Sequence, residues 1–74
     1  MDEWRKQWGL NIQVARRRKN LSQRALAELL EVSQAAVGRW ETGVSVPTDR
    51  HKIAIATVLD EDVRVMFPLT RGMA

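Results

Sequence analysis

The sequence contains no cysteine in its 74 residues, so neither disulfides nor thiolate zinc sites can stabilise the fold. A chain this short buries a modest core, and its stability must come from packing apolar helix faces. No apolar run approaches the length of a bilayer-spanning helix, and the first seven residues are charged rather than signal-like. We therefore expect a single soluble domain over residues 1–74, located in the cytoplasm.

The sequence also lacks the side-chain groupings that catalysis and metal binding require. His51 is the only histidine, and no nucleophile, paired carboxylates or phosphate-cradling loop accompanies it. The acidic run Asp60-Glu61-Asp62 has no supporting histidine or fourth acid, so it indicates a helix start rather than a metal site. We expect no catalytic residue, no metal, no cofactor, no small-molecule substrate and no membrane partner.

Positive charge is in excess but unevenly placed. The net charge is +3 and the isoelectric point is about 10.2. Residues 1–39 carry eight lysines and arginines against four acids, and residues 40–74 carry four against five. A basic first half is compatible with a polyanionic partner without proving one.

Capping and breaking residues divide the chain into short helices. Ser22, Ser33 and Thr48 are good N-caps, while Asn20 and Gly43 favour the left-handed backbone that ends a helix. The expected helices run from Trp4 or Asn11 to Lys19 (with a possible break at Gly9), from Gln23 to Leu30, from Gln34 to about Thr42, from Asp49 to Leu59, and from Asp62 to before Pro68. No segment alternates as a strand would, so we predict an all-α, compact five-helix domain.

The helix-turn-helix domain is expected to have its core segment at about residues 10–69, and apolar residues at helical spacing define the side chains that it buries. They are Trp8, Ile12 and Ala15; Leu26, Ala27, Leu29 and Leu30; Ala36, Val37 and Trp40; Ile53, Ala56 and Leu59; Val63, Met66 and Phe67. Trp4 fits either the core or a dimer contact. Residues 70–74 have no pattern and are expected to fray.

The most informative segment lies between Ser22 and Glu41. Two short helices are separated there by three residues, 31–33, which is the connection length of a helix-turn-helix. In that motif the first helix crosses the phosphate backbone and the second enters the major groove of duplex DNA. The second helix presents one apolar side and one side of small or hydrogen-bonding residues: Gln34, Ala35, Gly38, Arg39 and Thr42.

The chemistry of that second side suits base pairs. The Gln34 amide can pair with adenine, Ala35 can touch a thymine methyl, and Arg39 can fork onto guanine or bind a phosphate. Gly38 costs about 1 kcal/mol of helix propensity relative to alanine. A glycine there is easier to understand if another molecule approaches it closely.

Several ordered motifs carry a family resemblance. They are Ser22-Gln23-x-x-Leu26-Ala27, Val32-Ser33-Gln34-x-x-Val37, Trp40-Glu41-x-Gly43-x-x-x-Pro47 and Ala56-x-x-Leu59, followed by the Phe67 region. Together they cover roughly residues 10–69 and resemble the lambda repressor/Cro-like helix-turn-helix family, also called XRE. One departure stands out: Glu31 occupies the turn position usually held by glycine, so the backbone there must be strained or the turn altered.

The resemblance implies a role for individual residues. It implies that Gln34, Ala35 and Arg39 read the bases and that Arg16 and Glu41 form a structural ion pair. Gln23 matches a phosphate contact, and the loop 43–48 matches a segment that binds phosphate through backbone amides. We expect phosphate contacts from the set Gln23, Arg24, Thr42, Ser45 and Thr48. Thr48 is equally explained as a cap, and Arg17, Arg18 and Lys19 as a solvated basic helix end.

The expected function is a sequence-specific regulator of transcription that binds double-stranded DNA. A phage or bacterial repressor of the Cro type, acting by occupying its operator, is the leading hypothesis. Two copies on a pseudo-palindrome would place their reading helices about 34 Å apart, which leaves a homodimer open. The alternatives are an excisionase-like or architectural recombination factor, an antitoxin that regulates its own promoter, and a protein-interaction module that binds no DNA.

Overall fold

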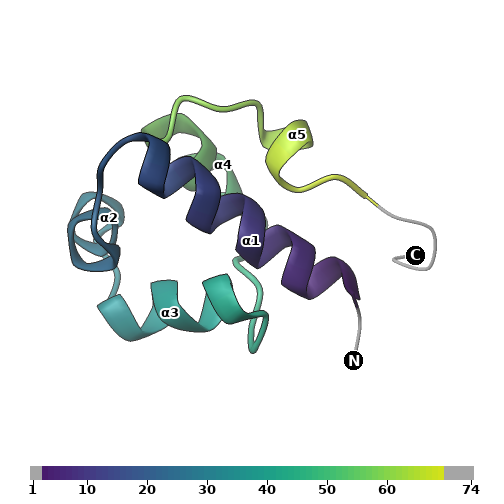
Figure 1. Cartoon of the computed structure of the whole chain (residues 1–74), viewed down its shortest axis with the longest axis horizontal. Helices are drawn as coiled ribbons and strands as arrows, with labels where there is room; N and C mark the ends of the chain where they lie inside the picture. The colour runs from purple at the N-terminus through teal and green to yellow at the C-terminus, as the bar shows by residue number, and fades with distance from the viewer. Residues whose placement is uncertain (1–2, 70–74) are drawn as a thin grey trace.

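The computed structural model describes residues 3–69, and within that range every regular element is helical (Figure 1). The elements are α1 (Glu3–Arg18), α2 (Gln23–Leu30), α3 (Gln34–Thr42), α4 (Asp49–Val58) and α5 (Val63–Met66). The predicted all-α, five-helix fold is confirmed, with α2 and α3 as the helix-turn-helix. The predicted fraying of residues 70–74 lies outside the described residues.

Side chains cap the helices where the sequence predicted caps. The hydroxyls of Ser22, Ser33 and Thr48 accept the backbone N–H of the residue three positions later, at the starts of α2, α3 and α4. Each cap satisfies one of the N–H groups that a helix start leaves unpaired. At α5, Asp62 accepts from the backbone and side chain of Arg64, and these hydrogen bonds hold the pKa of Asp62 below its ordinary value.

All four connections between the helices contain a residue in the left-handed backbone, including Asp60 (φ 58°) between α4 and α5. Asn20 has φ 57°, Glu31 has φ 57° and Gly43 has φ 80°. Asn20 and Gly43 tolerate this conformation, as expected. Glu31 adopts it as well and donates its N–H to the carbonyls of Ala27 and Glu28. The turn geometry is therefore kept, and the strain of a non-glycine residue is accepted.

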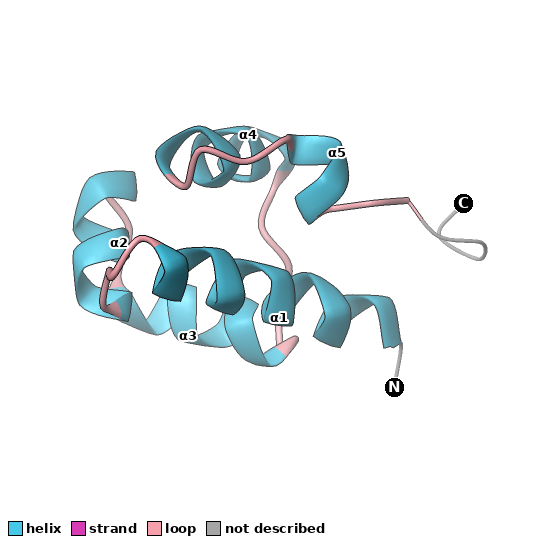
Figure 2. Cartoon of the chain, turned by 45° about the horizontal axis from the view of Figure 1, so that its top comes forward, coloured by secondary structure: helices cyan, strands magenta, loops and turns pink. Residues whose placement is uncertain are grey.

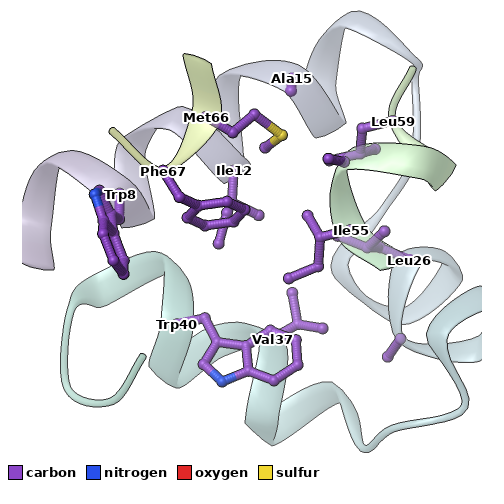
Figure 3. Packing of buried hydrophobic residues seen from close by; sticks show 12 residues of the cluster. Trp8, Ile12, Ala15, Leu26, Val37, Trp40, Ile55, Leu59, Met66 and Phe67 are labelled. Atoms are coloured by element: carbon purple, nitrogen blue, oxygen red, sulfur yellow. The ribbon is translucent and has the colours of Figure 1, made fainter. Parts of the chain in front are cut away.

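One apolar core joins all five helices (Figure 3). Its most deeply buried side chains are Ile12, Leu26, Val37, Ile55 and Leu59. Trp8 packs edge-on against Phe67, with ring centroids 5.4 Å apart, and its indole N–H donates to the Pro68 carbonyl. Trp4 is half-buried and lies edge-on against Trp8, at 4.9 Å. The first helix therefore closes the core with its tryptophans.

Three predictions about local structure were wrong. Gly9 does not break the first helix: α1 is continuous, and a Cβ on Gly9 would lie 2.4 Å from the Glu41 carbonyl oxygen. The glycine is needed because α1 and the end of α3 touch there. Leu29 and Ile53 were expected in the core but are 57% and 59% exposed. The inward side of α2 is centred on Leu26, Ala27 and Leu30, and Leu29 lies beyond its margin. On α4 the buried isoleucine is Ile55, which lies nearly opposite Ile53 on the helix.

Candidate nucleic-acid interface

The exposed side of α3 carries the residues expected to read bases. Gln34, Ala35 and Arg39 are all exposed, whereas Val37 and Trp40 on the opposite side are buried. Thr42 is also exposed, and its hydroxyl donates to the Gly38 carbonyl at 3.0 Å. The core thus holds α3 by its apolar back and leaves an amide, a methyl and a guanidinium facing away from the protein.

Gly38 lies in the middle of this exposed side and has open surroundings. A Cβ placed on it would meet only the Gln23 side-chain oxygen, at 3.9 Å. No contact within the described chain therefore requires a glycine at this position. The missing side chain leaves a shallow surface between Gln34 and Arg39 where another molecule can approach the helix backbone.

The Arg16–Glu41 ion pair fixes the end of α3 against α1. Two guanidinium nitrogens donate to the two carboxylate oxygens, Nε at 2.6 Å and Nη2 at 3.0 Å. The remaining terminal nitrogen of Arg16 donates to the Leu21 carbonyl at 2.8 Å. This fork-on-fork geometry is the strong form of a charge-assisted pair. It joins α1, the loop after α1 and the end of α3.

Gln23 belongs to the same network, which the sequence did not reveal. Its side-chain amide donates to Glu41 Oε1 at 3.0 Å. This contact joins the start of α2 to the end of α3, and no pattern of neighbouring residues in the sequence predicts it. This bond uses one of the two hydrogens of the Gln23 amide nitrogen.

The other expected phosphate contacts lie in different settings. Arg24 is exposed and pairs with Glu28 at 3.3 Å, while Ser45 is half-buried in the loop after α3. The Thr48 hydroxyl caps α4 and lies 3.2 Å from His51 Nδ1, so its structural role alone explains it. Thr42 ends α3, and the loop 43–48 follows it. The N–H groups of Gly43, Val44 and Ser45 donate to the carbonyls of Arg39 and Trp40, and Pro47 has no N–H, so of the loop amides expected to bind phosphate only those of Val46 and Thr48 are left.

The four basic residues 16–19 at the end of α1 point in different directions. Arg16 turns inward to Glu41. Arg18 and Lys19 turn toward the start of α5 and lie 3.8 Å from Glu61 and 3.7 Å from Asp60. Arg17 is exposed. These residues therefore do not form one patch, as expected for a full turn of helix.

Two further properties of the described residues bear on function. Across residues 3–69, no three histidine, cysteine or acidic side chains come together as a metal site would require. None of the helices in this range combines the length and apolar character needed to cross a bilayer.

The fold and the exposed side of α3 define a helix-turn-helix protein. The helix-turn-helix family matches residues 12–65 of the chain, and the chain belongs to this family, in its XRE-type branch. The family predicted from the sequence motifs is thus confirmed.

Two known proteins resemble the chain over most of its length. The HTH-type transcriptional regulator DicA of Escherichia coli (strain K12) is 43% identical over 70 residues, covering 78% of this chain and 52% of DicA. The chain therefore spans about half the length of that curated relative. The restriction-modification controller protein C.AhdI from Aeromonas hydrophila superposes with a TM-score of 0.78 at 31% identity, covering 84% of this chain and 94% of C.AhdI.

Proposed function

We propose that this chain is a sequence-specific regulator of transcription that binds double-stranded DNA. The observation that carries the proposal is the exposed side of α3, where Gln34, Ala35 and Arg39 face away from a buried apolar back. The resemblance to a transcriptional regulator and to a controller protein supports it. A protein partner is less well served by this side, because small and polar residues make poor binding hot spots.

In this proposal α3 enters the major groove and α2 lies across the backbone. Gln34, at the start of α3, pairs its amide with an adenine edge, and Ala35 packs on a thymine methyl. Arg39 lies one turn further along and donates to N7 and O6 of a guanine. These three residues choose the sequence.

Phosphate contacts supply affinity that does not depend on sequence. The set consists of the second amide hydrogen of Gln23, the Arg24 guanidinium, the Ser45 hydroxyl and the two loop N–H groups that are not used within α3, those of Val46 and Thr48. The Thr42 hydroxyl joins the set by releasing the Gly38 carbonyl, because it has one hydrogen to donate. The Thr48 hydroxyl joins it only if it serves the phosphate and the helix cap together. The Arg16–Glu41 pair fixes the end of α3 against α1, and the bond from Gln23 to Glu41 ties it to the start of α2. Together they align the base-reading residues with the phosphate contacts.

The finer features of the proposal concern regulation and assembly. The chain acts as a repressor of the Cro type, by occupying a site that polymerase needs, in the cytoplasm. Two copies bind a pseudo-palindrome with reading helices about 34 Å apart. The exposed side of α3 would serve an excisionase-like factor or an antitoxin equally, and DNA bending or a toxin partner would separate these from a repressor.

Selection of bound sites from random duplex DNA tests the proposal. We expect an enriched motif of two half-sites separated by about 10 base pairs, centre to centre. Enrichment of a single half-site would retain sequence reading and reject the dimer. Failure to enrich any motif, with equal binding to every duplex, would reject sequence-specific regulation.

A further inference from the structure

The part of α1 that precedes the family match reaches the same side of the molecule as α3. The match begins at residue 12, whereas α1 begins at Glu3. Figures 1 and 2 show this N-terminal half of α1 next to the C-terminal end of α3. Nine helical residues thus extend past the matched region, beside the loop that follows the exposed helix.

Two glycines allow this extension to pack closely against the end of α3, because they have no side chain in the way. A Cβ on Gly9 would lie 2.4 Å from the Glu41 carbonyl oxygen. A Cβ on Gly43 would lie 3.2 Å from the Lys6 backbone nitrogen and 3.3 Å from the Arg5 carbonyl carbon. The backbone at Lys6 therefore packs directly on the residue that opens the loop 43–48, and its position is fixed.

The direction of the Lys6 side chain follows from the helical period. At about 100° per residue, Ile12 and Lys6 lie on opposite sides of Gly9, each about 60° away from it. Gly9 faces α3 and Ile12 points into the core. Lys6 consequently lies about 120° around α1 from Ile12, on the flank of the contact with α3 that is turned away from the core. Lys6 is exposed, and within residues 3–69 no acidic side chain forms an ion pair with it.

We propose that Lys6 is an additional phosphate-binding residue, which neutralises the DNA backbone beside the loop 43–48. The inference rests on the proposed function, since it uses the same duplex and the same orientation of α3. The ammonium group contributes charge without choosing a base, so it raises affinity for every sequence alike. The N-terminal extension of α1 thus widens the backbone contact beyond the helix-turn-helix.

Arg18 provides a matched control on the same helix. It is an exposed cation like Lys6, but it turns to the α5 side, where it lines a groove with Glu61 and Val65. Removing either cation changes the net charge of the protein equally. Only the removal of Lys6 takes charge from the side that faces DNA in this proposal.

The experiment measures binding of wild type, Lys6→Ala, Lys6→Arg and Arg18→Ala to a selected site and to random duplex, between 50 and 200 mM salt. For Lys6→Ala the slope of log affinity against log salt should shrink by about one for each bound copy. The advantage of wild type over Lys6→Ala should therefore fall roughly threefold per bound copy across this range, on both duplexes. Lys6→Arg should match wild type, and Arg18→Ala should keep the wild-type slope.

Other results would overturn the inference. An unchanged slope for Lys6→Ala, or an equal change for Arg18→Ala, would place Lys6 away from the phosphates. A loss confined to the selected site would make Lys6 a base contact. Failure of wild type to bind any duplex would instead reject the proposed function itself. Equal melting temperatures of wild type and Lys6→Ala exclude a folding defect.

Discussion

The carboxylate of Glu41 and the guanidinium of Arg16 are almost removed from water, with side chains 2% and 10% exposed. Such a pair contributes little relative to a well-packed apolar substitute, but loss of one partner leaves a buried charge unpaired. Glu41 also accepts from Gln23, so its removal frees a side chain at the start of α2. The pair therefore matters for stability and for the alignment of the exposed helix.

Replacing Glu41 with alanine should lower the free energy of unfolding by about 3–5 kcal/mol, because the Arg16 guanidinium stays buried without its partner. Thermal and denaturant unfolding measure the loss. The double substitution Arg16→Met with Glu41→Leu should recover part of it, since neither charge then remains. An unchanged melting temperature for Glu41→Ala would show that the ion pair has no structural weight.

Arg39 is the residue at which base reading is tested most directly. Arg39→Ala should cost roughly 1–3 kcal/mol of binding free energy on the preferred site and relax the preference at one base position. Titration of the selected and random duplexes measures both effects. Arg24→Ala, which removes an exposed cation from α2, should weaken the two duplexes equally. An equal loss on both duplexes for Arg39→Ala would make Arg39 a phosphate contact.

At the scale of elements, two glycines in helices have opposite surroundings. A Cβ on Gly9 would clash with the backbone of Trp40 and Glu41, whereas a Cβ on Gly38 would meet only the Gln23 side-chain oxygen, at an ordinary contact distance of 3.9 Å. Gly9→Ala should destabilise the fold by about 1–3 kcal/mol or more, because backbone atoms cannot move aside as side chains do. Gly38→Ala should raise stability by up to about 1 kcal/mol through helix propensity.

The same pair of variants separates folding from binding. In Gly38→Ala the added methyl group lies on the exposed side of α3, so affinity for the selected site should fall although the fold is more stable. Melting curves and DNA titrations of the two variants provide the comparison. Gly38→Ala with wild-type affinity would mean that DNA does not approach this part of α3 closely.

The turn between α2 and α3 holds Glu31 at φ 57°. Glu31→Gly should raise the free energy of unfolding by about 1 kcal/mol, because glycine adopts this backbone without steric cost. Glu31→Ala serves as the control and should keep the strain. If both variants unfold at the same denaturant concentration, the left-handed backbone at this turn carries no measurable cost.

In the proposed complex, cations from α1, α2 and α3 face DNA together, and at the scale of the whole molecule this predicts a strong salt dependence of binding. Neutralisation of about three phosphates would weaken the binding of a single copy roughly 40-fold when salt is raised fourfold. Titrations across that range on random duplex measure the slope without the base contacts. A flat response would favour a protein partner over DNA.

Local chemistry determined much of this protein. The helix boundaries are set by local features, because each of these acts within a few residues of itself. They are the N-caps Ser22, Ser33 and Thr48 and the residues in the left-handed backbone, Asn20 and Gly43. The spacing of motifs from Ser22 to Leu59 identified the family. The outward side of α3 was also predictable, since a helix with one apolar side has only one way to face a core.

Tertiary structure decided what depends on helices that are distant in the sequence. In the sequence Gly9 suggests a helix break, but in the structure it lets α1 pack against the end of α3. Leu29 and Ile53 have the spacing of core residues, but the packing of α2 and α4 leaves both side chains exposed. The bond from Gln23 to Glu41 and the position of Lys6 beside Gly43 likewise depend on how the helices cross. Periodicity gives the sides of a helix, but only packing selects which side meets which neighbour.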